Sequence, residues 1–458
     1  MTAARERATL AVLFVGVLLA ALDIAIVGPA LPAIQATFAV APRWLPAVFS
    51  VYVLLYLVGT PLLSKRSDRH GRRRVFLESL AVFGIGSLLV AAAWSFPVLL
   101  LGRAIQAFGA GGLLPVAAAV IAETVPLERR GRTLGLIGAV FGVAFLLGPL
   151  LGGLLLGSSW RWLFVINVPV SLVLMVFAAR VLPRAGGRDG GRFDAMGSAL
   201  LAVVLAAMVV GIGQIDTNAP AASLQSLRVW PCFVLIAVCF PLLWNVEKRA
   251  ADPVLPPALL KSPQLRVVGV IAIAVGAAEA GMVFLPAMAV LNFGIDERSA
   301  SLTMVPLVLT LAVGAPLAGR LLDHIGARSV VQLGLALTVA GLSLFGLLPL
   351  DWPNFYLSGA LVGFGLSALL GAPLRYIALH ESGEERRGAG QGLLTLCISA
   401  GQLVGAAIIG GIVGSASHAL LGFRHSLLAV AAACALALVL SVALRGRVTR
   451  EPGAQVNA

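Results

Sequence analysis

Three charged residues lie inside long apolar stretches of the sequence. Asp23 and Glu279 fall near the middle of their stretches, and Arg103 lies in another apolar stretch. A charge at the centre of a membrane-spanning helix costs roughly 2.5–3.5 kcal/mol on insertion scales, so a charged residue that is kept there is a candidate for function.

Desolvation favours the neutral form of a carboxyl group, whereas a nearby arginine favours the charged form. A carboxyl group inside the membrane can therefore be poised to bind and release a proton. If a cationic compound and a proton compete for one carboxylate, binding of one releases the other. This competition is the minimum that exchange of the two across a membrane requires. The alternative for Asp23, Arg103 and Glu279 is a buried structural hydrogen bond or ion pair.

The composition indicates that lipid is the solvent of this chain. Of its 458 residues, 59% are apolar and only 12% are charged. Soluble domains average about 45–50% apolar and about 25% charged residues, so an ordinary soluble protein is excluded. The four cysteines lie in apolar runs without disulfide or metal-ligand spacing, and we expect them to be packing residues and the chain to hold no metal.

Fourteen apolar stretches are long enough to cross the hydrocarbon core as helices, which takes about 17–25 residues. They are 9–32, 44–64, 75–94, 98–122, 132–156, 162–182, 195–215, 229–247, 266–291, 299–321, 328–348, 354–379, 388–414 and 424–445. We therefore predict an all-α integral membrane protein. Twelve crossings are the alternative, because removing 195–215 and 229–247 as one hairpin leaves every other loop on the same side.

The positive charges predict the orientation of the chain, because cytoplasmic loops carry an excess of Lys and Arg. With the N-terminus inside, most of the 33 basic residues fall on the cytoplasmic side. We predict a multi-pass protein of the cell (inner or plasma) membrane with both termini in the cytoplasm. Most of the net charge of +13 then serves orientation, and no nucleic-acid partner is expected.

Two segments at corresponding positions of the sequence resemble each other. PLLSKRSDRHGRRR follows the second stretch and PLAGRLLDHIGARS follows the tenth, and each has an Asp (Asp68, Asp323) three residues before a Gly (Gly71, Gly326). Basic residues complement a helix C-terminus, and an Asp can pair with an adjacent Arg. We predict loops that act as clasps near the cytoplasmic surface; a solvated charge cluster is the alternative.

The matching segments divide the chain into two halves. We predict an N-terminal six-helix half over 1–183, a two-helix insertion with its linkers over 184–260, and a C-terminal six-helix half over 261–458. Parallel halves around a central cavity are a transporter architecture, with the binding site near the midplane at their interface.

Several motifs together resemble one family. They are LDIAIVGPALP from Leu22 to Pro32, SKRSDRHGRRR, LGRAIQAFGAGGLLP around Arg103, GPLLGG at 148–153, and WRWLFVINVP at 160–169. The chain resembles the major facilitator superfamily, specifically its fourteen-helix branch of drug:proton antiporters. It departs from the family pattern at Ser64 and Arg66, where Gly and Leu are usual, and at Gly28 and Ala107.

The resemblance implies a major facilitator fold with two six-helix halves plus a two-helix insertion, and roles for particular residues. It assigns Asp23 and Arg103 to proton coupling. The assignment of Glu279 to the same role rests only on its position near the middle of its apolar stretch. It assigns a gating role to the cytoplasmic motif, which comprises Asp68, Arg69, Gly71 and Arg72 with the counterparts Asp323 and Gly326. It also implies that Gly148, Pro149, Gly152 and Gly153 shape a gate between the halves; ordinary helix packing explains the last two glycines as well.

A cavity for lipophilic compounds should be lined by apolar and aromatic side chains. We expect the lining to include Trp44, Tyr52, Tyr56, Gln106, Phe141, Phe145, Met282 and Phe284, although each aromatic or Met residue could equally be packing.

The sequence contains no GxxxxGK[ST] phosphate-binding loop and no HExxH motif, so we expect neither an ATPase nor an enzyme. We predict a monomer without cofactors that uses the proton gradient to export lipophilic or cationic drugs, with the substrate, protons and membrane lipids as partners. Export of lipids or other amphiphiles by the same fold is the alternative. An intramembrane enzyme or a receptor is the less favoured third reading.

Overall fold

The computed structural model describes residues 3–183, 194–250, 253–383 and 387–445, and within these ranges every regular element is a helix. The first group of helices comprises α1 (Ala3–Phe38), η1 (Pro42–Trp44), α2 (Pro46–His70), α3 (Arg72–Ala91), α4 (Phe96–Thr124), α5 (Leu127–Leu155), α6 (Trp162–Val165) and α7 (Asn167–Val181). Next come α8 (Ala195–Gly213), α9 (Pro220–Leu224) and α10 (Trp230–Arg249). The last group comprises η2 (Leu259–Lys261), α11 (Pro263–Val283), α12 (Leu285–Phe293), α13 (Glu297–Leu302), α14 (Val305–Leu347), α15 (Trp352–Leu370), α16 (Ala372–Ser382), α17 (Arg387–Ser415), α18 (Ala419–Leu440) and η4 (Ser441–Ala443).

Twelve helical segments of the described chain are long and apolar enough to cross a membrane. A helix pairs its backbone N–H and C=O groups internally, which is what a lipid environment demands. The chain is therefore an all-helical protein built to span a bilayer several times.

The lengths of α14 and α5 affect how many membrane crossings the chain can make. α14 has 43 residues and would be about 65 Å long if it were straight, roughly twice the thickness of the hydrocarbon core. It is interrupted at Gly326, whose φ of 80° and ψ of 163° are not helical. α5 has 29 residues, and its segment Val143–Leu155 is a further apolar helix.

The charged motifs fold as helix and not as the loops that we predicted. Residues 64–70 continue α2, and only Gly71 departs from helical geometry, with φ 90° and ψ 141°. Gly326 makes the equivalent break in the second motif, at φ 80°. Arg and Lys are good helix formers and complement the negative end of a helix, which explains why the charged residues extend it. Glycine takes these backbone angles without a steric penalty.

Three predicted single helices are each divided by a short break. Stretch 162–182 is interrupted at Ile166, 266–291 at Phe284 and 354–379 at Gly371. A proline follows each break by two or three residues, at 169, 286 and 373. Proline lacks an N–H group and cannot continue the preceding turn, so the helix restarts there.

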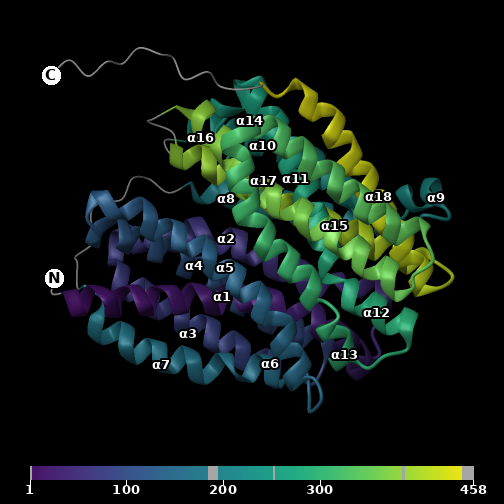
Figure 1. Ribbon diagram of the computed structural model, residues 1–458, viewed down its shortest axis with the longest axis horizontal. Helices are drawn as coiled ribbons and strands as arrows, with labels where there is room; N and C mark the ends of the chain where they lie inside the picture. The colour runs from purple at the N-terminus through teal and green to yellow at the C-terminus, as the bar shows by residue number, and fades with distance from the viewer. Residues whose placement is uncertain (1–2, 184–193, 251–252, 384–386, 446–458) are drawn as a thin grey trace.

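The helices form two groups with the α8–α10 segment beside them. Figure 1 shows α1–α7, in purple to blue, on one side and α11–α18, in green to yellow, on the other. α8 packs against α10, α2 and α17. The two groups meet through α17, which contacts α2 and η1, and through α12 and α13, which contact α1 and α5. Here Ser301 Oγ donates a hydrogen bond of 2.7 Å to the Pro149 carbonyl. We call this the η1 end, and the opposite end, with Gly71 and Gly326, the Gly71 end.

Candidate functional site

Asp23 lies in a polar cluster that is sealed inside the first group of helices. Arg103 Nη1 lies 2.5 Å from Asp23 Oδ2, and both side chains have no exposed surface. Oδ1 accepts hydrogen bonds from Gln106 Nε2 at 2.6 Å and from Asn167 Nδ2 at 3.1 Å. Helices α1, α4 and α7 thus supply the acid, its cation and two neutral donors, and both carboxylate oxygens are satisfied.

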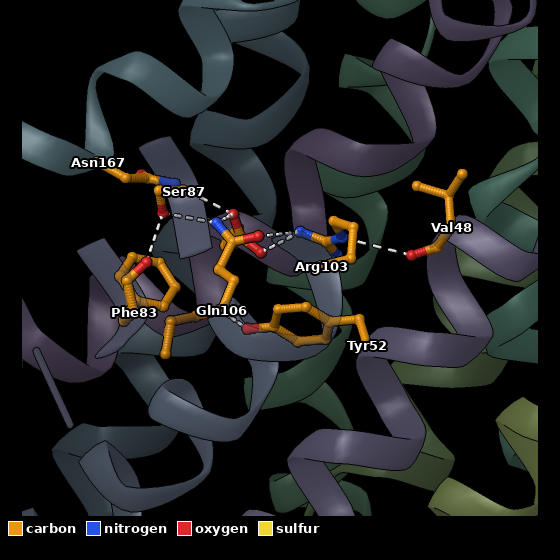
Figure 2. Close-up of polar contacts among 9 residues, drawn as sticks. Val48, Tyr52, Phe83, Ser87, Arg103, Gln106 and Asn167 are labelled. Atoms are coloured by element: carbon orange, nitrogen blue, oxygen red, sulfur yellow. Dashed lines mark hydrogen bonds and ion pairs between the residues drawn. The ribbon is translucent and has the colours of Figure 1, made fainter. Parts of the chain in front are cut away.

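The guanidinium group of Arg103 is held on several sides. It donates to Gln106 Oε1 at 2.8 Å and, through Nε, to the Val48 carbonyl at 3.3 Å. Its Cζ lies 4.2 Å from the centre of the Tyr52 ring, a cation–π distance, and Figure 2 shows the ring beneath the guanidinium. Of its three nitrogens only Nη2 has no hydrogen-bond partner.

A relay of hydrogen bonds leads from Asp23 to α3. Gln106 Nε2 also donates to Ser87 Oγ at 2.7 Å, and Ser87 Oγ donates to the Phe83 carbonyl at 2.9 Å (Figure 2). Small residues allow this approach of α3 and α4. A Cβ atom added at Gly86 would collide with the Gln106 backbone, so only Gly lets these two helices lie at this distance.

A separate cavity lies between the two groups of helices and contains Glu279. Its volume is about 100 Å³. The lining is otherwise apolar and comes from both groups, and it includes Ile24, Gly28, Phe145, Met282, Leu307 and Leu366. Glu279 is the one ionisable residue among the described lining residues and keeps part of its surface accessible. Gln402 of α17 is a polar neighbour of its carboxyl group.

One helix connects the cluster to the cavity. Ile24, Ala25 and Gly28 of α1 line the cavity, whereas Asp23 points into the cluster. Close packing fixes α1 here: a Cβ at Gly28 would lie 2.7 Å from the Val283 carbonyl oxygen, and one at Gly148 would lie 2.7 Å from Ala25 Cβ. A shift of α1 therefore changes both the cluster and the cavity wall.

The predicted lining residues divide into those that face the cavity and those that do not. Phe145 and Met282 line it, together with Pro149 of the GPLLGG motif. Tyr52 and Gln106 are instead fully buried in the polar cluster. Phe284 is buried and stacks on Phe423, and Tyr56 stacks on Tyr52.

Two further predicted residues lie elsewhere. Trp44 is exposed in η1. The Phe141 side chain lies outside the described residues.

Asn167 and Ser87 were not predicted as members of the cluster. Asn167 stands in WRWLFVINVP and Ser87 within an apolar stretch. A buried polar residue needs a partner, and this rule could have pointed to both.

The two charged motifs differ in their contacts. In the first, Arg72 Nη1 lies 2.5 Å from Asp68 Oδ1 and its Nε lies 3.2 Å from Glu123 Oε1. This clasp joins the α2–α3 junction to the end of α4. In the second, Asp323 is exposed and has no hydrogen bond or ion pair within the described part of the chain.

No group of three His, Cys, Asp or Glu side chains in the described ranges is placed to hold a metal ion. The site consists of one buried ion pair and one carboxyl group in an apolar cavity. Such groups can exchange protons and bind cations, and the fold contains no catalytic constellation among the residues described above.

The sequence matches the Major Facilitator Superfamily over residues 13–277 and 267–458, and the chain belongs to this family. Its members are membrane transporters, which are generally not enzymes. The chain is accordingly a multi-pass membrane transporter.

Three relatives illustrate the range of the family. An uncharacterized MFS-type transporter, YfiU of Bacillus subtilis, is 35% identical over 87% of this chain and 78% of its own. Multidrug resistance protein 3 of the same organism is 28% identical, with the same coverage. A triacylglyceride transporter of Mycobacteroides abscessus is 30% identical over 86% of this chain and 80% of its own.

A solved structure shows the same fold. A bacterial homologue of the human lysosomal transporter Spinster, in an inward-facing and occupied conformation, superposes with a TM-score of 0.69 at 17% identity, over 96% of this chain and 97% of that chain.

Proposed function

We propose that the protein is a secondary transporter that uses the proton gradient to export lipophilic or cationic drugs by alternating access. The observation that carries this proposal is Glu279, a single carboxyl group in an otherwise apolar cavity between the two groups of helices. An apolar wall suits many lipophilic compounds, and one acid selects those with positive charge.

Competition for one carboxyl group provides the coupling. A cationic substrate and a proton cannot both occupy Glu279, so arrival of one displaces the other. In this mechanism the acid takes up a proton from the outside and gives it up when the cytoplasmic substrate binds.

The Asp23–Arg103 pair is the second coupling element. α1 carries Asp23 on one face and cavity-lining residues on the other. Protonation of Asp23 would leave the Arg103 charge without its counter-ion in a sealed site, which strongly favours a rearrangement. Because α1 is shared, that rearrangement would reshape the cavity wall.

The architecture that we propose has fourteen crossings with both termini in the cytoplasm. α14 contributes two crossings on either side of Gly326, and α5 contributes one, in addition to the remaining long helices. The halves extend over 1–183 and 261–458, and 184–260 forms the insertion. Gly152 and Gly153 of α5 act at the η1 end as a gate against Ser301 and Leu302 of α13.

Export of a lipid or another amphiphile is the second candidate. The apolar lining and the relative described as a triacylglyceride transporter favour it. In that case the cavity would accept an uncharged substrate and Glu279 would serve protons alone.

Transport by purified protein in proteoliposomes tests both candidates. We expect an imposed pH gradient to drive uptake of a lipophilic cation such as ethidium by the wild type, and Glu279→Gln to abolish the response to the gradient. The matched control is Glu297→Gln in α13, which does not line the cavity. Gradient-driven movement of a fluorescent triacylglyceride but not of ethidium would replace the first candidate with the second.

A further inference from the structure

A second cavity, of about 520 Å³, lies away from the central one, at the Gly71 end of the first group. It is formed by the end of α2, by α3 and by the middle of α4. None of its lining residues belongs to the Glu279 cavity or the Asp23 cluster. Only Arg69 of the cytoplasmic motif is shared with it, and the proposed transport cycle has no role for the cavity itself.

The rim of this cavity is basic. Lys65, Arg66, Arg69 and His70 line it from the last turns of α2. Glu78 also lines the cavity and neutralises Arg66, with Arg66 Nε 2.8 Å from Glu78 Oε2, so Lys65, Arg69 and His70 make up the remaining basic rim. Arg69 also lines the cavity, is exposed, and has no ion pair within the described ranges.

The interior of the cavity is apolar. Leu62, Val82 and Phe108 line it, and all three are only partly buried. Val82 lies about 16 Å along the helix axis from Gly71, and half of a hydrocarbon core is about 15 Å thick. The length of the groove along α3 thus matches the depth of one leaflet.

A buried polar atom also lies beside the groove. Ser79 is one of the lining residues, and its Oγ is buried between α3 and α4 and has no hydrogen-bond partner. An unpartnered buried hydroxyl is uncommon and calls for a ligand atom. A glycerol ester oxygen below a phosphate head would provide one.

We propose that this groove binds an anionic phospholipid of the cytoplasmic leaflet, with the phosphate at Arg69 and Lys65 and one acyl chain along Leu62, Val82 and Phe108. Arginine binds phosphate through its planar fork of donors, and clusters of basic residues at a membrane surface attract anionic lipids. A soluble anion would bind at the basic rim and would not need the apolar interior of the groove. An apolar peptide would bind in the interior and would not need the basic rim.

Native mass spectrometry of the full-length protein tests the proposal. We expect the wild type to retain phosphatidylglycerol at least several-fold more than phosphatidylcholine with the same acyl chains. Millimolar inorganic phosphate should not displace the lipid. Equal retention of the two lipids, or full displacement by phosphate, would overturn the proposal.

Two variants test separately how the basic rim and the apolar interior of the groove contribute to lipid retention. Arg69→Gln should reduce retention of phosphatidylglycerol to the level of phosphatidylcholine, and Val82→Trp should reduce retention of both lipids by filling the apolar interior. Arg73→Gln is the control, because it removes the same charge from a nearby side chain that does not line the groove. An equal loss in Arg73→Gln would show that general surface charge is responsible. If Arg69→Gln failed to fold, Val82→Trp and the wild-type lipid comparison would still decide.

Discussion

Arg103 Nη1 lies 2.5 Å from Asp23 Oδ2 in a cluster from which solvent is excluded. Each charge has only the other as its counter-ion, with Gln106 and Asn167 completing the carboxylate. Breaking a buried pair by removing one partner costs about 3–5 kcal/mol, far more than an exposed pair contributes. A protonation event at Asp23 would therefore have a large structural effect.

Asp23→Asn should abolish gradient-driven transport and destabilise the protein. The expected loss is about 3–5 kcal/mol of unfolding free energy, because Arg103 keeps its charge in a site without solvent. Thermal unfolding of the detergent-solubilised protein measures the stability, and proteoliposome uptake measures the transport.

The double variant Asp23→Asn/Arg103→Gln separates the structural from the coupling role. It removes both charges, so we expect it to regain part of the stability and none of the proton coupling. Normal coupling in the double variant would show that the pair is only structural.

Tyr52 should act as a platform for Arg103 and not as a substrate contact. Tyr52→Phe keeps the ring and loses only a long hydrogen bond of 3.4 Å to the Ala20 carbonyl, so its effect should stay below about 1 kcal/mol. Tyr52→Ala removes the fully buried ring and should cost about 3–5 kcal/mol. Thermal unfolding compares the two variants. A changed KM for the substrate in Tyr52→Phe would argue against this assignment.

Gly152 should control closure at the η1 end. A Cβ at this position would collide with the Ser301 side chain and lie 2.9 Å from Pro29 Cβ, so Gly152→Val should force α5 and α13 apart. We expect slower transport and faster thiol labelling of a Ser301→Cys reporter on the same background. Gly392→Val in α17 is the control, since no atom lies within 4 Å of its added Cβ. Unchanged labelling in Gly152→Val would contradict a closed contact there.

Gly71→Ala and Gly326→Ala should each destabilise the protein by about 1–3 kcal/mol, because a side chain is strained at φ values of 90° and 80°. Gly319→Ala in α14 has free space around the added atom and no such strain, so it should be neutral or slightly stabilising in the helix. Equilibrium unfolding would compare the three. A neutral Gly326→Ala would show that the two motifs are not equivalent in structure.

The sequence predicted which segments are buried in the membrane, but not which way their individual side chains face. The apolar stretches predicted where most of the helices lie, and the cost of buried charge selected Asp23, Arg103 and Glu279 as candidates, which lie in the buried cluster and the cavity. Whether Tyr52 and Gln106 face the cavity or the interior of the first group could not be predicted. All faces of a buried helix are apolar, so the hydrophobic periodicity that would distinguish them is weak. Only the packing of α1, α2 and α4 brings them to Arg103.

The breaks between helices were equally hard to predict. The motif of Asp68 and Arg69 is polar and therefore indicated a loop, but its residues extend α2 until Gly71. The prolines at 169, 286 and 373 provided a signal for the interrupted helices that hydropathy alone does not contain.

Proton movement driven by substrate is the most direct test of the central claim. The purified protein would be placed in liposomes that contain a pH-sensitive dye, without an imposed gradient, and ethidium would be added on one side. We predict that ethidium drives proton movement in the opposite direction with the wild type and none with Glu279→Gln. An equal proton response in Glu279→Gln would contradict the assignment of Glu279 as the group for which substrate and proton compete.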